Sequence, residues 1–207
     1  TTDEITRARN GLGGEFAIEW GPSFLHNQLL SSSDYTRLTL SARGYLPLYE
    51  VEPAEGMNVF SSYLAGFGSV DWATGPEIPL SVRQTTGGRS IRSAPGGSVR
   101  GYASGRFDAT LKAIGNVEIR NNLPAIVWPG LVPGIVLYTD TGYYLDTLAT
   151  SPVADEHSGF LLSSGAGVSL ELFGVASFVF YTNYLWTATS VDGERWIPFS
   201  LGFGYHY

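Results

Sequence analysis

The residue types that most often perform catalysis or bind metal ions are few and scattered in this sequence. Histidine occurs three times, as His26, His157 and His206, and cysteine is absent. The lack of cysteine excludes a disulfide framework, a thiolate zinc site and a cysteine nucleophile. No two histidines have the spacing of metal ligands. We therefore predict that the chain uses no cofactor or metal and is not an enzyme.

One histidine has neighbours that could take part in hydrolysis. His157 follows Asp155 and Glu156 and precedes Ser158 on a predicted loop. A lipid hydrolase or acyltransferase would need a nucleophile activated by a neighbouring base. No strained nucleophile motif accompanies these residues, so a membrane-embedded enzyme ranks third among our functional hypotheses.

Arginines form the densest group of charges of one sign. Five of them and no acidic residue lie between Ile78 and Phe107, whereas the other 7 of the 12 basic residues face 19 acidic ones. This run belongs to a long connection that we predict over 73–107. We expect such a basic loop to fold back onto inward-facing carboxylates of the flanking strands. The arginines are Arg83, Arg89, Arg92, Arg100 and Arg106.

Strands are the elements that would position these charges. Apolar and polar residues alternate with a period of two, which is typical of β-strands with two unlike faces. No segment has a sustained helical period. We predict an all-β chain of eight strands, over 16–24, 37–48, 57–72, 108–120, 135–146, 159–172, 175–187 and 197–207.

Strand length and composition favour strands that cross a membrane. Several predicted strands reach about the nine to eleven residues that a bilayer requires, whereas soluble strands average five or six. Charged residues make up 15% of the chain, compared with about 25% in a typical soluble domain. We predict a transmembrane antiparallel β-barrel. A soluble lipocalin-like barrel remains an alternative, because alternation alone does not distinguish the inside from the outside.

The chain is expected to form one domain over 1–207. The uncharged run from Leu172 to Val191 is long enough for a membrane helix, but its β-branched and aromatic residues favour a turn at Gly174 and then a strand. The polar first ten residues are typical of a mature or processed start. Connections at 27–34, 73–107, 147–157 and 191–194 would lie on one side of the membrane, and those at 50–56, 121–133 and near 174 on the other.

Three short motifs follow one another in the order loop, strand, strand. They comprise the loop motif Val99-Arg100-Gly101-Tyr102, a strand with Asn116, Glu118 and Arg120, and a strand with Tyr138, Asp140 and Gly142. In this order they resemble the BamA-like superfamily of outer-membrane assembly and translocation proteins. The resemblance covers the last eight strands of such a barrel. We expect no periplasmic polypeptide-binding module in this chain.

The resemblance implies a contact between the loop and the barrel wall. In the family, acidic residues of two neighbouring strands hold the loop arginine inside the barrel. Carried over, Arg100 would pair with Glu118 and Asp140, and both carboxylates fall on the inward face of the predicted alternation. A buried guanidinium requires such partners, and two carboxylates suit its planar fork of donors.

The last predicted strand also resembles an outer-membrane assembly signal. The signal has a polar residue, a glycine and two alternating aromatic residues at the end of the chain, here Ser200, Gly202, Tyr205 and Tyr207. Outward-facing aromatic residues of this strand would suit lipid and the interfacial girdle of a membrane barrel.

The size of the loop limits how the barrel can close. An eight-stranded barrel is barely wide enough to hold its own side chains, so a basic loop of about thirty residues would not fit inside it. We expect a second copy, a partner barrel or a periplasmic protein to complete the structure. Alternatively, the eight strands close alone and the loop packs over the mouth.

The resemblance implies a role in inserting, assembling or translocating proteins in a bacterial-type outer membrane. The second hypothesis is a small structural or oligomer-forming outer-membrane barrel without transport activity. Outer-membrane lipid is an expected partner of either. The net charge of −7 argues against nucleic acid as a partner.

Overall fold

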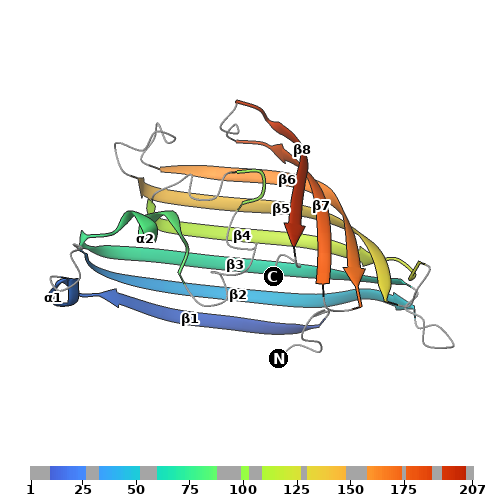
Figure 1. Cartoon of the computed structure of the whole chain (residues 1–207), viewed down its shortest axis with the longest axis horizontal. Coiled ribbons are helices and arrows are strands. Elements are labelled where there is room, and N and C mark those ends of the chain that lie inside the picture. Colours follow the sequence, from blue (N-terminus) through green and yellow to red (C-terminus); the bar gives the residue numbers. More distant parts are fainter. Residues whose placement is uncertain are drawn as a thin grey trace.

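One antiparallel sheet accounts for most of the structure. The computed structural model describes residues 10–26, 33–51, 60–87, 99–102, 109–126, 130–147, 158–173, 176–187 and 193–203. Within these ranges eight strands pair in sequence order (Figure 1), which confirms the prediction of an all-β chain. The strands are β1 (Gly11–Gly21), β2 (Asp34–Val51), β3 (Phe60–Glu77), β4 (Ala109–Asn122), β5 (Leu131–Thr147), β6 (Ser158–Leu172), β7 (Ala176–Leu185) and β8 (Trp196–Phe203).

Two short helices accompany the sheet in the described ranges. α1 (Ser23–His26) follows β1, and α2 (Leu80–Gln84) follows β3. Among the described residues, no helix has the length and apolar character needed to cross a membrane. Within the uncharged run after Leu172, strand β7 forms as the composition predicts, and the predicted turn at Gly174 lies outside the described residues.

Some strands extend beyond their predicted ends. β3 continues to Glu77 and carries Gly75 and Pro76 within it, so that the long connection covers 78–108 instead of 73–107. β5 begins at Leu131 instead of residue 135 and includes Pro133. Proline and glycine usually mark the end of a strand. Here they lie near strand ends, where the missing N–H or the unusual backbone angles disturb the ladder least.

The polar face of the sheet is buried and the apolar face is exposed, as expected for membrane-spanning strands. Side chains such as Thr39, Ser69 and Asn116 are buried, whereas large apolar side chains on the opposite face, such as Phe16 and Leu137, are exposed. A soluble barrel would bury its apolar face and expose the polar one. The lipocalin-like alternative is therefore not supported by this arrangement.

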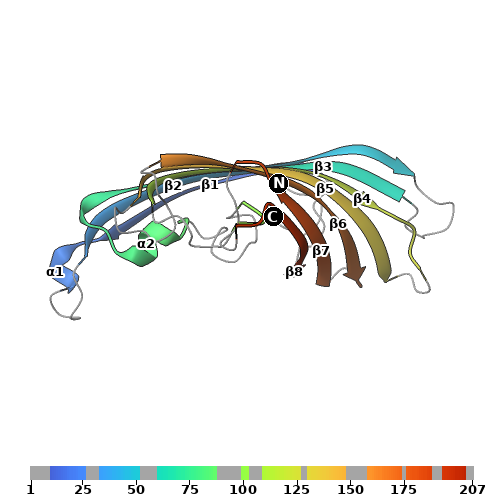
Figure 2. The ribbon, with the colours of Figure 1, turned by 90° about the horizontal axis from the view of Figure 1, so that it is seen from above.

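The sheet is strongly curved and is not closed. β1 pairs with β2 and β8 pairs with β7, and no pairing joins β1 to β8 in the described part of the chain. Figure 2 shows the curvature and places α2 on the concave side of the sheet. The buried polar side chains lie on this concave face, where the loop between β3 and β4 contacts them.

Tryptophan side chains mark one end of the sheet. Trp20, Trp72, Trp186 and Trp196 are each about half exposed or more, with exposed fractions of 65%, 48%, 53% and 53%. All four lie toward the strand ends at which the β3–β4 connection leaves the sheet. Tryptophan gathers in this way at the water interface of a bilayer.

Candidate functional site

The loop motif Val99–Tyr102 forms a tight turn on the concave face. The Tyr102 N–H donates to the Val99 carbonyl at 3.2 Å. Gly101 has φ +88°, and a Cβ added there would lie 2.6 Å from Leu185 Cδ2. Both the backbone conformation and the close approach to the wall therefore favour glycine at this position.

Strand pairing brings the two acidic residues of the wall side by side. β4 and β5 are antiparallel, with Glu118 opposite Tyr138 and Asn116 opposite Asp140. Residues two apart on a strand share a face, so Glu118 and Asp140 occupy diagonal positions on the concave face. Both side chains are fully buried, with exposed fractions of 1% and 0%.

Arg100 bridges these two carboxylates. Its Nη1 lies 2.5 Å from Glu118 Oε1, and its Nη2 lies 2.6 Å from Asp140 Oδ1. Nε and the backbone N–H of Arg100 both donate to Asp140 Oδ2, at 2.6 and 3.0 Å. The structure thus brings together the three residues of the predicted contact, and the pair with Asp140 is bidentate.

Aromatic rings cover the guanidinium. The Arg100 Cζ lies 3.4 Å from the centre of the Tyr138 ring and 5.3 Å from that of Tyr181. The two rings pack edge to face with centres 5.5 Å apart. Stacking on aromatic faces adds to the ionic contacts and excludes water from them.

The arginine is held in its charged form. Burial alone would lower the pKa of Arg100, but the hydrogen bond from its side chain to Asp140 and the charges of Glu118 and Asp140 raise it overall. A buried charge that keeps its ionised form depends on such partners. The partners of the guanidinium therefore favour its charged form.

The remaining motif residues support the contact. Arg120 Nε donates to Glu118 Oε2 at 2.5 Å, so that Glu118 lies between two guanidinium groups. Gly142 leaves space for the loop, because a Cβ there would lie 2.7 Å from Val99 Cγ2. Asn116 is fully buried beside them.

Apolar packing fixes the two ends of the turn. Val99 and Tyr102 form a buried cluster with Leu161 of β6 and Leu185 of β7. The Tyr102 hydroxyl also donates to the Leu162 carbonyl at 3.3 Å. The turn therefore contacts four consecutive strands, β4 to β7.

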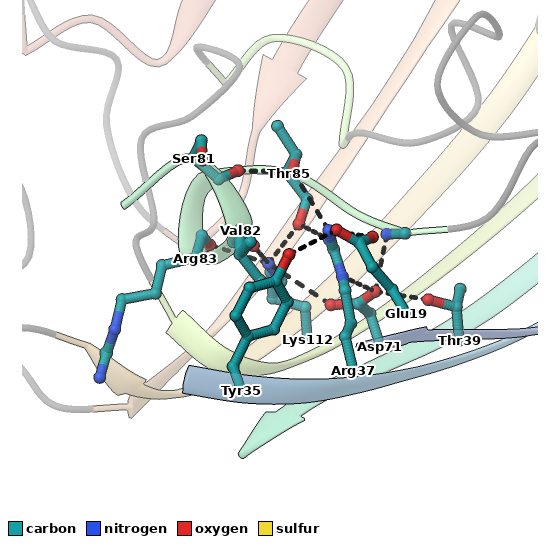
Figure 3. A network of polar contacts seen from close by, with 11 residues as sticks. Glu19, Tyr35, Arg37, Thr39, Asp71, Ser81, Val82, Arg83, Thr85 and Lys112 are labelled. Atoms are coloured by element: carbon teal, nitrogen blue, oxygen red, sulfur yellow. Dashed lines mark hydrogen bonds and ion pairs between the residues drawn. The ribbon is translucent and has the colours of Figure 1, made fainter. Parts of the chain in front are cut away.

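A second contact between loop and wall was not predicted from the sequence. Figure 3 shows Asp71 of β3 at its centre, with Arg37 of β2 and Lys112 of β4 beside it. Asp71 Oδ2 accepts hydrogen bonds from Arg37 Nε at 2.8 Å, from Thr39 Oγ1 at 2.8 Å and from the Gly87 N–H at 2.7 Å. The Lys112 ammonium lies 3.6 Å from Asp71 Oδ1.

Basic residues of the wall bind the loop through its carbonyl groups. Lys112 Nζ donates to the carbonyls of Val82 and Arg83 at 3.1 and 2.8 Å, and also to that of Thr85. Arg37 Nη2 donates to the same Thr85 carbonyl. We refer to Arg37, Asp71 and Lys112 as the mouth site, and to the contacts of Arg100 as the arginine site.

The sequence holds one signal that could have located the mouth site. Arg37, Asp71 and Lys112 are inward-facing charges on three neighbouring strands. Asp71 is directly opposite Lys112 in the strand register, and Arg37 is diagonal to it, opposite Ala73. The expected contact was between loop arginines and wall carboxylates. Arg83 makes no such contact among the described residues; its guanidinium donates to the Asp146 carbonyl at 3.1 Å.

Several predicted residues lie elsewhere or cannot be described. Ser200 and Gly202 belong to β8, where the Ser200 hydroxyl accepts from Asn183 Nδ2 at 2.9 Å. The described ranges contain no group of three acidic, histidine or cysteine residues that could hold a metal ion. Outside the described residues lie Arg89, Arg92, Arg106, His157, Tyr205, His206 and Tyr207.

Comparison with known proteins gives one match. The model of the Omp85 superfamily domain matches residues 1–205 of the chain. No curated protein and no solved structure was found to match it.

Proposed function

The chain belongs to the Omp85 superfamily, and on this premise we propose that it takes part in inserting, assembling or translocating proteins of a bacterial-type outer membrane. Members of this superfamily are associated with outer membranes. The proposed activity is mechanical: strands of the sheet act as a template for strands of another protein, and no reaction is catalysed.

The open edge of the sheet is the observation that supports this proposal. β1 pairs with β2, and β8 pairs with β7. In the described part of the chain, the outer edge of each of these two strands pairs with no other strand. Inside a bilayer, each unsatisfied backbone group costs several kcal/mol. Such an edge therefore favours pairing with an incoming strand.

Strand length adds to the argument at one edge. β7, the strand next to this edge, has 10 residues, whereas β2 and β3 have 18 each. A short membrane strand is matched by a thinner bilayer. The bilayer beside β7 is therefore expected to be thinner than beside β2, which would lower the barrier for a client strand to enter at the adjoining edge.

A second candidate is an oligomer-forming outer-membrane barrel without transport activity. The concave face already holds α2 and the Val99–Tyr102 turn, and a closed eight-stranded barrel has room for little beyond its own side chains. More strands are then needed to enclose the loop. In a dimer, β1 of each copy could pair antiparallel with β8 of the other, so that both edges would be paired permanently. A client strand, in contrast, would occupy an edge for a short time.

Insertion kinetics distinguish the two candidates. An unfolded eight-stranded outer-membrane protein is diluted from urea into lipid vesicles that contain the chain, and its folding is followed by the heat-dependent shift in gel mobility. Vesicles with a closed, unrelated eight-stranded barrel serve as the control. Faster folding than in the control supports assembly activity. Equal folding rates, together with a stable dimer by native mass spectrometry, would favour the oligomeric barrel and reject the first proposal.

A further inference from the structure

The loop segment 79–87 is held almost entirely through its backbone. Lys112 donates to three carbonyl groups of the segment and Arg37 to one of them, and Asp71 accepts from the Gly87 N–H. Among the described residues, a contact of the mouth site with a side chain of the segment joins Arg37 Nη1 to Thr85 Oγ1, at 3.4 Å. Backbone groups of this kind are present in every polypeptide.

Side chains of the segment contribute little to the contact. Leu80 is 50% exposed, and Val82 is the one buried residue of α2. The Arg83 guanidinium makes an exposed hydrogen bond to a carbonyl outside the mouth site. The mouth site therefore binds backbone groups of the segment and makes little contact with most of its side chains.

The bound conformation depends on the wall. α2 has five residues, and Pro79 at its N-cap provides no side-chain hydrogen bond to the helix. A helix of this length is not stable alone, because nucleation fixes several residues for each hydrogen bond gained. A segment with few buried contacts belongs to the parts of a protein that open most easily.

The mouth site is closed to water while the segment is bound. With the segment in place, Arg37, Asp71 and Lys112 are buried, with exposed fractions of 2%, 0% and 8%. Buried charges without hydrogen-bond partners are costly. Replacing one polypeptide backbone by another preserves the same kinds of hydrogen bond, so that the exchange changes the free energy little.

We propose that the mouth site is a binding site for polypeptide backbone, and that segment 79–87 is its resident, displaceable occupant. The ligand is an unfolded or extended polypeptide with a glycine at the position of Gly87. This inference rests on the proposed role in protein assembly, since it assigns a contact point for the client. It is tested below by binding alone, independently of insertion.

Gly87 allows the occupant to be removed while the site stays intact. A Cβ added at Gly87 would lie 2.8 Å from Arg37 Nε and 3.0 Å from Asp71 Oδ2, and it would also overlap Thr39 Oγ1. Gly87→Ala is therefore expected to release the segment and leave the wall residues unchanged. Gly66→Ala is a matched control, because a Cβ at Gly66 meets no atom within 4 Å.

The experiment measures peptide binding to the full chain in detergent micelles by fluorescence anisotropy. One labelled peptide has the sequence of residues 78–88, and a second keeps its two glycines and has alanine elsewhere. The resident segment competes at a high effective concentration. We therefore expect both peptides to bind Gly87→Ala at least about tenfold more tightly than they bind the wild type or Gly66→Ala.

A second substitution shows whether the peptides occupy the mouth site. Gly87→Ala/Lys112→Met is expected to lose the gain, and Gly87→Ala/Asp71→Asn tests the same point if the first variant fails to fold. Equal binding to Gly87→Ala with and without Lys112 would overturn the proposal. The proposal would also be overturned if the peptide with the native sequence bound and the alanine peptide did not. The site would then be specific for the side chains of its own loop. Neither result would affect an observed insertion activity, so the two proposals fail separately.

Discussion

Asp140 accepts three hydrogen bonds from a single residue, Arg100. The backbone N–H and Nε of Arg100 both donate to Oδ2, and Nη2 donates to Oδ1. One carboxylate therefore fixes both the side chain and the backbone of the loop at that position. The bond from the backbone N–H would remain after truncation of the arginine side chain, whereas the ionic contacts would not.

Replacement of Arg100 should destabilise the loop and the sheet beneath it. Arg100→Ala leaves Asp140 buried without its cation and Glu118 with Arg120 alone, which is expected to cost about 3–5 kcal/mol of unfolding free energy. Arg100→Lys should restore part of this loss, because an ammonium cannot make the bidentate contact. The loss is measured by heat-dependent gel mobility and by protease resistance of the loop. Arg83→Ala is the matched control and should change stability by less than about 0.5 kcal/mol; if the two alanine variants behaved alike, the arginine site would have no role in holding the loop.

Glu118 should be more sensitive to neutralisation than the partly exposed carboxylate Glu19. It accepts from Arg100 Nη1 and from Arg120 Nε, both at 2.5 Å. Glu118→Gln keeps the shape but removes the charge between two buried guanidinium groups, at an expected cost of about 3 kcal/mol. Glu19→Gln is the comparison: its contact with Arg37 is 3.7 Å long and its side chain is 33% exposed. That change should cost less than about 1 kcal/mol, and equal losses in urea unfolding would argue against the shared role of Glu118.

Alanine substitutions at two glycines with similar backbone angles can distinguish the cost of backbone strain from the cost of a steric clash. Gly101 has φ +88° and Gly193 has φ +81°, but a Cβ at Gly193 meets no atom within 4 Å. Gly193→Ala should cost about 1–2 kcal/mol through its backbone alone. Gly101→Ala adds a clash with Leu185 and should also expose the loop to protease. A Gly101→Ala variant that was no less stable than Gly193→Ala, with a protected loop, would show that the close approach to β7 is unimportant.

Local patterns were sufficient to predict the strands and the shared face of Glu118 and Asp140. These residues fall on one face because the side chains of a strand alternate, and this holds for any strand pairing that keeps the faces aligned. The pairing of Arg100 with them was implied by the family resemblance of the motifs and not by the alternation. The diagonal position of the two carboxylates depends on the β4–β5 register, which alternation does not determine.

The mouth site was missed for a different physical reason. Its loop partners are mainly backbone carbonyl and N–H groups, which have no signature in the sequence, and Lys112 resembles an ordinary lysine of a strand. The end of β3 was also misplaced, because Gly75 and Pro76 are typical of turns. The strand continues there because β2 continues beside it, with Asp34 opposite Glu77, and such long-range pairing is not encoded locally.

The two sites should hold the loop independently. The mouth site lies on β2 to β4, whereas the Val99–Tyr102 turn contacts β4 to β7. Lys112→Met should therefore release segment 79–87 and leave the contacts of Arg100 in place, because the Val82 and Arg83 carbonyls lose the Lys112 donor and the Thr85 carbonyl keeps Arg37 alone. Limited trypsin digestion followed by mass spectrometry should show faster cleavage after Arg83 and unchanged protection after Arg100.

Arg100→Ala should release the Val99–Tyr102 turn and leave Arg83 as protected as in the wild type. Simultaneous release of both segments in either variant would mean that the loop opens as one cooperative unit, and the separate exchange of segment 79–87 would then require the arginine site to open as well.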